Sequence, residues 1–226
     1  MAIFSPAPLQ QPVVSDSGEA ALFFDSGVMP DHTLQARIRE LALLASEMEG
    51  VTQTRPGVGN LMICFDPERT ERRTLQPLLV QAWEQTKGHV HPGRLIEVPV
   101  EYGGESGPDL VHVSEILGLS TDEVIALHLS ATYTAATVGA LPGFPYLMGL
   151  NRKLSLGRRD SPRLSVPAGS VVIAGGMCGI ITRQSASGWH IIGRTSLDLF
   201  DLEQTPPNAI APGDDIRFHR VMGQAC

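Results

Sequence analysis

The sequence predicts an α+β protein in which a domain of mixed helices and strands precedes a β-barrel. Two changes of pattern along the 226 residues indicate this arrangement. Up to about residue 100, two segments with apolar residues at helical spacing alternate with short apolar runs. Beyond residue 133, short apolar runs separated by Gly and Pro turns follow one another without another helix, which is typical of a barrel. We therefore expect domains at residues 1–100 and 101–226.

The first domain is expected to follow the order βαββαβ. A frayed leader at residues 1–12 precedes it. Strands are predicted at residues 20–24, 51–55, 61–65 and 95–100, the middle two forming a hairpin around a Pro-Gly turn. One helix begins at the candidate N-cap Asp31 and ends at Gly50, and a second stops near Gly88. This order is the split βαβ arrangement of ferredoxin-like domains.

The second domain is expected to begin with a loop at residues 101–107 and two short helices. The first ends at Gly118, and Ser120 with Glu123 forms a capping box for the second. The pair imitates a DNA-binding helix-turn-helix, but residues 101–131 contain six acidic residues and no Lys or Arg. Phosphates would repel such a surface, so this alternative is rejected. Strands follow at residues 133–138, 165–166, 170–174, 179–182, 189–193, 197–200 and 216–221.

A Pro-rich segment at residues 141–150 interrupts these strands. Pro142 and Pro145 lack a backbone N–H, which argues against a helix interior or a central strand. We expect a rigid loop that presents Phe144 and Tyr146. Such a loop is either a binding surface or a plug at the end of the barrel.

A basic segment follows this loop. It contains Arg152, Lys153, Arg158, Arg159 and Arg163, relieved only by Asp160. Guanidinium groups bind carboxylates and phosphates in bidentate fashion, so the segment is a candidate anion site or a surface for an acidic partner. The alternatives are a solvated loop, or pairing with the acidic residues of 101–131.

Composition excludes several classes of function. The net charge of -7 is spread over both halves, which argues against binding to nucleic acid. No apolar run approaches the roughly 20 residues of a membrane span, and the N-terminus does not look like a signal peptide, so a cytoplasmic protein is expected. Three scattered cysteines suit a reducing compartment and give no zinc spacing, and His89 with His91 predicts a solvated turn.

No self-contained catalytic motif is present. The sequence lacks GxSxG, GxxxxGK[ST], HExxH and CxxC. Cys178 could be a nucleophile only beside a base, and its apolar, Gly-rich setting favours a packed, inert thiol. His128 and His190 each lie in an apolar pattern, which favours structural roles for both.

Five ordered motifs remain, at residues 101–110, 142–147, 162–163, 166–170 and 192–195. In this order they resemble the family that includes the B-type subunit of 5-oxoprolinase, allophanate hydrolase subunit 1 and the sporulation-kinase inhibitor protein. The resemblance implies that the second domain is a cyclophilin-like barrel, although no prolyl-isomerase activity follows from that fold. Together with the basic segment, the resemblance makes six residues candidates for substrate or anion binding: Phe144, Tyr146, Arg159, Arg163, Met177 and Arg194. It identifies no catalytic or cofactor-binding residue and no metal ligand.

One departure concerns residues 177–182, where the family usually has Gln-Thr-Gly-Ile-Tyr-Pro. Met177 and Cys178 replace the Gln and the Thr and remove two polar groups beside the expected pocket. The chain would then recognise a less polar ligand or be a divergent paralogue.

The resemblance also implies a function. The chain would be one subunit of a carboxyltransferase-like heteromer, paired with a second subunit of the allophanate hydrolase subunit 2 type and possibly a third. That complex would carry out ATP-dependent hydrolysis of a small amide or lactam, with conversion of 5-oxoproline to glutamate as the first candidate. ATP would be handled with the partner subunits, and the chain alone would be inactive. The alternative is an inhibitor that docks its barrel on a histidine kinase.

Overall fold

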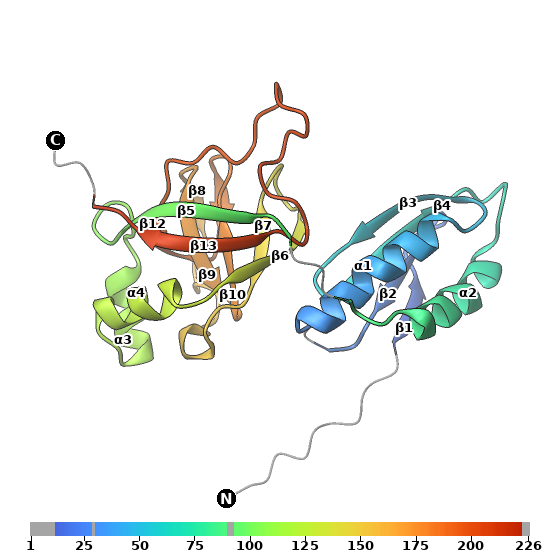
Figure 1. Ribbon diagram of the computed structural model, residues 1–226, viewed down its shortest axis with the longest axis horizontal. Helices are drawn as coiled ribbons and strands as arrows, with labels where there is room; N and C mark the ends of the chain where they lie inside the picture. The colour runs from blue at the N-terminus through green and yellow to red at the C-terminus, as the bar shows by residue number, and fades with distance from the viewer. Residues whose placement is uncertain (1–11, 29, 90–92, 223–226) are drawn as a thin grey trace, which may run out of the picture. The chain divides into compact units, whose positions relative to one another are not determined.

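A computed structural model describes residues 12–28, 30–89 and 93–222 of the chain (Figure 1). The chain divides into two compact units, Met1–His91 and Pro92–Cys226, and each has its own hydrophobic core. The predicted α+β class, with a helix-and-strand unit before a barrel, is confirmed.

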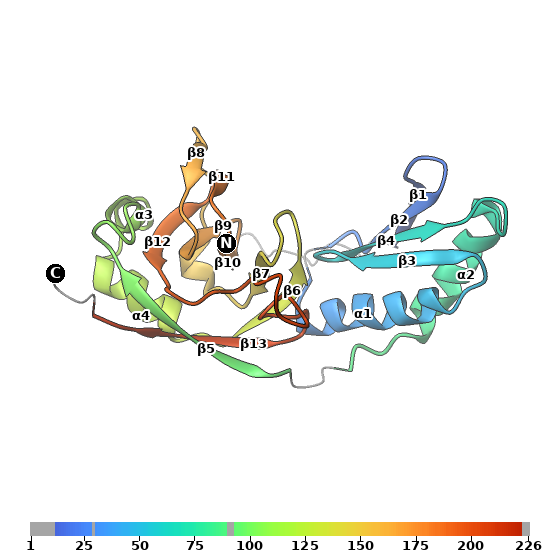
Figure 2. The same cartoon turned by 90° about the horizontal axis from the view of Figure 1, so that it is seen from above.

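The first unit consists of a four-stranded antiparallel sheet and two helices. The sheet has the order β1-β2-β4-β3, formed by β1 (Val13–Asp16), β2 (Ala21–Asp25), β3 (Val51–Pro56) and β4 (Asn60–Phe65). Helices α1 (His32–Ser46) and α2 (Arg72–Gln85) pack on the sheet (Figure 2). The predicted N-cap is confirmed, because the Asp31 carboxylate accepts the Leu34 N–H at 2.8 Å.

The assignment of residues 95–100 to this first sheet is wrong. They belong to β5 (Leu95–Tyr102), which pairs in parallel with β13 (Asp215–Arg220) and buries Val98 and Val100 in the barrel core. The edge position beside β2, where a ferredoxin-like domain has its fourth strand, is taken instead by β1. Only Val14 of β1 packs against the core, so this strand lacks the apolar alternation that would reveal it in the sequence.

The second unit is a closed barrel with the strand order β10-β7-β6-β13-β5-β12-β9. Its remaining strands are β6 (Tyr133–Val138), β7 (Pro145–Met148), β9 (Ser170–Ala174), β10 (Met177–Ile180) and β12 (His190–Arg194). A separate two-stranded ribbon, β8 (Arg163–Val166) with β11 (Ser185–Ser187), projects from the barrel (Figure 2). Two predicted strands match β6 and β9 in full. Residues 197–200 form no strand, and only an isolated bridge joins Phe200 to Asn208.

The Pro-rich segment is only partly the loop that was expected. Pro145 is the first residue of β7, which lies between β6 and β10 in the barrel. A proline is tolerated at that first position because the strand is only starting to pair there. The turn is confined to the residues before it, where the Phe144 N–H donates to the Leu141 carbonyl and Gly143 has a φ of 75°.

The two predicted helices are present, and they lie in the chain between β5 and the other barrel strands. Helix α3 (Leu110–Leu117) ends at Gly118, whose φ of 65° is the left-handed conformation of a helix C-cap. Helix α4 (Thr121–Leu129) begins with the capping box of Ser120 and Glu123. No helix within the described residues is long and apolar enough to cross a bilayer.

Three predictions fall partly on residues outside the described ranges. The expected leader at residues 1–12 is one of them, since the description begins at residue 12. Cys64 and Cys178 are free thiols, whereas the third cysteine, Cys226, lies outside those ranges. Of the His89 and His91 pair, only His89 is described, and its ring nitrogen Nδ1 lies 3.3 Å from a Glu40 carboxylate oxygen.

Candidate functional site

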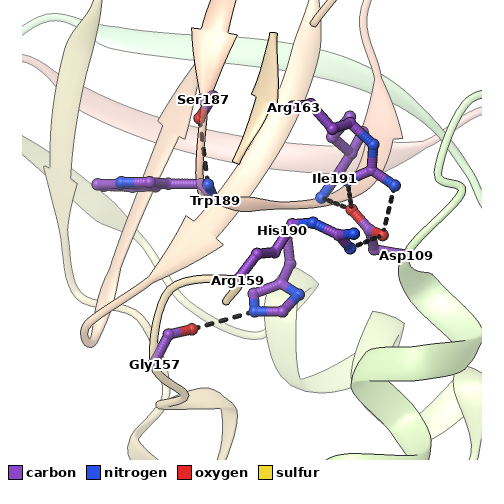
Figure 3. Close-up of polar contacts among 8 residues, drawn as sticks. All are labelled: Asp109, Gly157, Arg159, Arg163, Ser187, Trp189, His190 and Ile191. Atoms are coloured by element: carbon purple, nitrogen blue, oxygen red, sulfur yellow. Dashed lines mark hydrogen bonds and ion pairs between the residues drawn. The ribbon is translucent and has the colours of Figure 1, made fainter. Parts of the chain in front are cut away.

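Asp109 is the centre of a buried polar cluster in the second unit (Figure 3). Its Oδ1 accepts hydrogen bonds from Arg159 Nη1 at 2.7 Å and Arg163 Nη2 at 2.7 Å. Its Oδ2 accepts Arg163 Nη1 at 2.6 Å and the Ile191 backbone N–H at 2.8 Å. The two predicted arginines therefore do come together, but around an acidic residue of the segment 101–131.

The environment of Asp109 keeps its carboxylate charged. The side chain is only 3% exposed, and burial alone would raise its pKa. Hydrogen bonds from Arg163 and from the Ile191 N–H, with the charges of both arginines, instead hold the pKa of Asp109 below its ordinary value. A buried carboxylate with two guanidinium partners ties three segments of the chain together.

The loop before α3 is built to place this carboxylate. The Gly107 N–H donates to the Gly103 carbonyl, and the Asp109 N–H donates to the Ile191 carbonyl at 3.0 Å. A Cβ at Gly107 would lie 2.1 Å from the Ile192 carbonyl oxygen, so only glycine fits this close approach to β12. Asp109 precedes α3, yet its side chain makes no helix cap and turns to the arginines instead.

A cavity of about 360 Å³ lies next to this cluster. It is lined by His112 and Ile116 of α3, by His190 of β12, and by residues 156–161 of the basic segment. His190 is 3% exposed, and its Nε2 lies 3.0 Å from the Gly157 carbonyl oxygen (Figure 3). The pKa of His190 is lowered, chiefly by burial, so the ring is neutral near pH 7.

Two buried polar atoms of this wall lack partners. Among the residues that the structure describes, neither His190 Nδ1 nor Arg159 Nε has a hydrogen-bond partner. Buried polar groups are normally satisfied, so these two atoms are exceptions. Both have almost no accessible surface, so neither is exposed to the cavity. The cavity lining itself combines the side chains of Arg158 and Arg159 with the imidazole of His190 and the carboxylate of Asp160.

Arg194 lies elsewhere on β12. Its exposed side chain donates to the Ala168 carbonyl at 3.2 Å. It lines a groove of about 540 Å³ that also includes Glu101, Arg183 and Phe200, and a smaller cavity of about 150 Å³ that includes Arg163. The predicted residues Arg163 and Arg194 thus meet at the smaller cavity, whereas Arg159 belongs to the cavity at His190.

The predicted aromatic residues form their own cluster. Phe144 and Tyr146 contact each other with ring centroids 4.9 Å apart, and both rings lie 5.9 Å from that of Trp189. Neither ring lines the cavities at Arg159 or Arg163. Figure 3 shows Trp189 and His190 projecting to different sides of the chain. The structure therefore does not bring Phe144 and Tyr146 to the arginines.

Met177 is also buried and lies at the start of β10, opposite Ala174. It lines none of the three cavities that contain the predicted arginines. Cys178 lies in the barrel core, and Met177 is buried as well, so both residues that replace polar ones in the family pattern have packed surroundings.

Cys178 has a base beside it after all. His128 Nε2 lies 3.4 Å from its Sγ, and Tyr102 Oη lies 2.8 Å from His128 Nδ1. Both Cys178 and His128 are fully buried; burial raises the pKa of the thiol and lowers the pKa of His128 to about 3. A neutral thiol without access to solvent is not a nucleophile, so the trio is part of the core.

The sequence patterns do not single out Asp109 as a candidate site residue, and they favour a structural role for His190. Asp109 precedes a predicted helix, a position where an acidic residue is normally interpreted as an N-cap. His190 alternates with apolar residues, as a core histidine does. No group of three or more His, Cys, Asp or Glu side chains within the described ranges could hold a metal ion.

Comparison with known proteins shows the family to which the chain belongs. Residues 12–210 match the family model described as "Carboxyltransferase domain, subdomain C and D". The chain is 40% identical over 204 residues to the B-type subunit of 5-oxoprolinase from Escherichia coli O157:H7, covering 89% of this chain and 92% of that protein.

Two solved structures share the fold. The protein TTHA0988 is 32% identical with a TM-score of 0.77, and the match covers 91% of this chain but 40% of that longer one. The urea amidolyase of K. lactis has a TM-score of 0.79 over 93% of this chain and 15% of its own, and at 18% identity it shows the fold alone. The matches in sequence together place this chain in the family of carboxyltransferase domains, subdomain C and D.

Proposed function

We propose that this chain is one subunit of an ATP-dependent amidohydrolase complex that opens 5-oxoproline to glutamate. The observation that carries the proposal is the 40% identity to a B-type subunit of 5-oxoprolinase across 92% of that protein. The match extends over nearly the whole length of the relative.

The size of the cavity at His190 suits a small polar substrate. Its volume of about 360 Å³ is at the small end of the range for ligand pockets. 5-Oxoproline carries a carboxylate, a lactam carbonyl and a lactam N–H. Arg158, which is exposed and lines the cavity, offers charge for the carboxylate of the substrate.

Asp109 and Arg163 have a positioning role in this proposal. Both Nη atoms of Arg163 are used by Asp109, and one Nη of Arg159 is used in the same way. The carboxylate therefore fixes the guanidinium of Arg159 beside the cavity and cancels much of the charge of the pair.

The reaction adds one water across the lactam C–N bond. The carbonyl carbon gains an oxygen to become a carboxylate, and the nitrogen gains a proton to become the amine of glutamate. At the cavity, the described residues of this chain offer one buried imidazole and no hydroxyl or thiol that is hydrogen-bonded to a base. We therefore assign the remaining catalytic groups to partner subunits.

We also assign ATP to the partners. The sequence has no GxxxxGK[ST] loop, and the arginines nearest the cavity are already paired with Asp109. These residues do not form a cradle for a triphosphate, and no step performed by this chain passes through ATP.

Reconstitution tests the proposal. This chain and its proposed partner subunits would be purified separately and assayed for ATP hydrolysis and glutamate release with 5-oxoproline. We expect turnover only when every subunit is present. Arg152→Gln, at an exposed residue outside the cavity, is the matched control for Arg158→Gln, which should raise the KM for 5-oxoproline.

Three results would contradict the proposal. Turnover by the isolated chain would show that it is self-sufficient. Turnover by the partners without this chain would place its function elsewhere. Stable binding of this chain to a histidine kinase, with loss of autophosphorylation and no complex with the partners, would do the same.

A further inference from the structure

We propose that the ribbon formed by β8 and β11 is the arm by which this chain binds a partner subunit. The surface that fits it has an apolar pocket for Leu164, surrounded by carboxylates for the arginines beside the ribbon. The inference rests on the proposed function, which requires partner subunits. It goes beyond that function by assigning the surface at which one of them binds.

The ribbon holds one large apolar side chain in water. Among the described residues its two strands pair only with each other, and Figure 2 shows them standing away from the other strands of the barrel. Arg163 is bound to Asp109 and Val166 is buried, so both ends of β8 are fixed. Leu164 lies between them and, at 90% exposed, is the most exposed leucine within the described ranges.

The exposed residues of the ribbon carry no charge. They are Leu164, Ser165 and Ala186, and Pro162 and Pro167 stand directly before and after β8. Proline has no backbone N–H, so the ends of β8 offer no donor to an added strand, and contacts there are made by side chains. The ribbon therefore presents a small uncharged surface with a leucine at its centre.

Three exposed arginines lie beside this surface. Arg158 is near the end of β11, because a Cβ on Gly188 would lie 3.9 Å from Arg158 Cβ. Arg194 lines the same small cavity as Ser165, and Arg183 lies two residues before β11. Arginines from three segments thus flank the uncharged surface.

The charges of these three arginines are not paired within the part of the chain that the structure describes. None of them forms an ion pair there. Glu105 lines the same cavity as Arg194, and Glu101 is opposite Arg194 on β5, yet neither is paired with it. Residues 151–194 contain seven Lys or Arg and one acidic residue, a net charge of +6 in a chain whose net charge is -7. The segment that forms the ribbon is therefore basic in an acidic chain.

This pattern fits an acidic partner. Interfaces have an apolar centre and a polar rim, and arginine is enriched in them. The ribbon alone is too small for a stable contact, which buries roughly 800 Å² on each side, so the flanking arginines must take part. A second copy of this chain does not fit, because a two-fold contact would place the same arginines against each other. A partner with carboxylates around an apolar pocket matches both features.

Association of the full chain with its purified partner subunits, measured by titration calorimetry, tests Leu164. Leu164→Ser should weaken binding roughly tenfold to a hundredfold, the effect of removing a leucine side chain from its pocket. Leu202→Ser is the matched control, because Leu202 is 73% exposed in another loop of the same unit, and its binding should stay within about twofold of wild type. Both variants should keep the wild-type melting temperature, because neither leucine is buried.

The salt dependence of the same binding tests the arginines. Wild-type affinity should fall as the NaCl concentration rises, since salt screens exposed charges. Arg183→Gln combined with Arg194→Gln should bind more weakly and lose most of this dependence. Arg55→Gln combined with Arg69→Gln, at two exposed arginines of the first unit, should retain both the affinity and the dependence. Equal losses from the two pairs of changes would overturn the inference.

Other outcomes would also overturn the inference. One is a Leu164→Ser variant that binds the partner subunits like wild type, or a Leu202→Ser variant that loses as much affinity. Another is self-association of the isolated chain that disappears in Leu164→Ser, which would assign the ribbon to a second copy. Binding to vesicles of phosphatidylserine and phosphatidylcholine that disappears in Leu164→Ser would assign it to a membrane surface.

Activity of the assembled complex separates this inference from the proposed function. If the complex turns over 5-oxoproline but Leu164→Ser assembles like wild type, the inference fails and the function stands. If assembly depends on Leu164 and the arginines but the complex releases no glutamate from 5-oxoproline, the function fails and the inference stands. Absence of any complex between the wild-type chain and the partner subunits contradicts both.

Discussion

Replacing Asp109 by Asn should be among the most damaging single changes that conserve side-chain size in the second unit. The carboxylate is 3% exposed and accepts four hydrogen bonds, three from guanidinium groups and one from a backbone N–H. The amide in Asp109→Asn removes the negative charge and turns an NH₂ group toward donors. Two arginines then remain without their counter-charge.

The magnitude follows from the burial of the three partners. Removing one partner of a buried ion pair costs about 3–5 kcal/mol. The side chains of Arg159 and Arg163 are 26% and 29% exposed, so water can solvate part of their charge, and we expect the lower end, about 3 kcal/mol. For a chain of this size that corresponds to a fall in melting temperature of roughly 6–12 °C.

Urea unfolding, followed by the fluorescence of Trp189 in a Trp83→Phe background, measures this change. Asp160→Asn, at an exposed acid of the basic segment, is the control and should stay within about 0.5 kcal/mol of its parent. A double-mutant cycle with Arg163→Met should give a coupling energy of about 2 kcal/mol or more. A loss below about 0.5 kcal/mol for Asp109→Asn, no larger than that of a neutral surface change, would refute the reasoning.

A comparison of the wild type with Asp109→Asn also tests the depressed pKa of Asp109. The folded-state pKa of Asp109 is depressed, so its contribution is fully present above the unfolded pKa of about 3.9 and is lost as pH falls through the folded value. The gap in stability between wild type and Asp109→Asn should be constant near neutral pH and shrink below about pH 4. A gap that grows on acidification would contradict the depressed pKa.

Two further predictions concern the buried trio in the barrel. In a Cys226→Ser background, a thiol reagent should modify the partly buried Cys64 in the native protein. Cys178 should remain unmodified until urea unfolds the barrel. Rapid labelling of Cys178 in the native protein would contradict its burial. Tyr102→Phe removes the hydroxyl 2.8 Å from His128 Nδ1 and should destabilise the second unit by about 1 kcal/mol in urea unfolding, whereas an unchanged stability would show that the contact contributes nothing.

Most elements of the fold are predictable because their signals are local. The N-cap at Asp31 and the capping box at Ser120 each depend on residues within one turn of a helix, and both predictions are confirmed. The prediction for β5 names the wrong sheet because its partner, β13, lies more than a hundred residues later. Apolar alternation identifies a strand but does not name the strand with which it pairs.

The candidate site shows the same limit. The basic segment points to Arg159 and Arg163, and pairing with the acids of 101–131 is among the expected alternatives. Nothing local distinguishes Asp109 from its five acidic neighbours in that stretch, since its role depends on contacts with Ile191 and both arginines. Nearness in sequence groups the aromatic residues with the arginines, whereas the barrel places Phe144 and Tyr146 against Trp189.

The most direct test of the proposed function is a crystal structure of the assembled complex with 5-oxoproline bound. We predict that the lactam lies in the cavity lined by His112, Arg158 and His190, with its carboxylate toward Arg158. Density for the ligand at a site formed only by partner subunits would contradict the proposal.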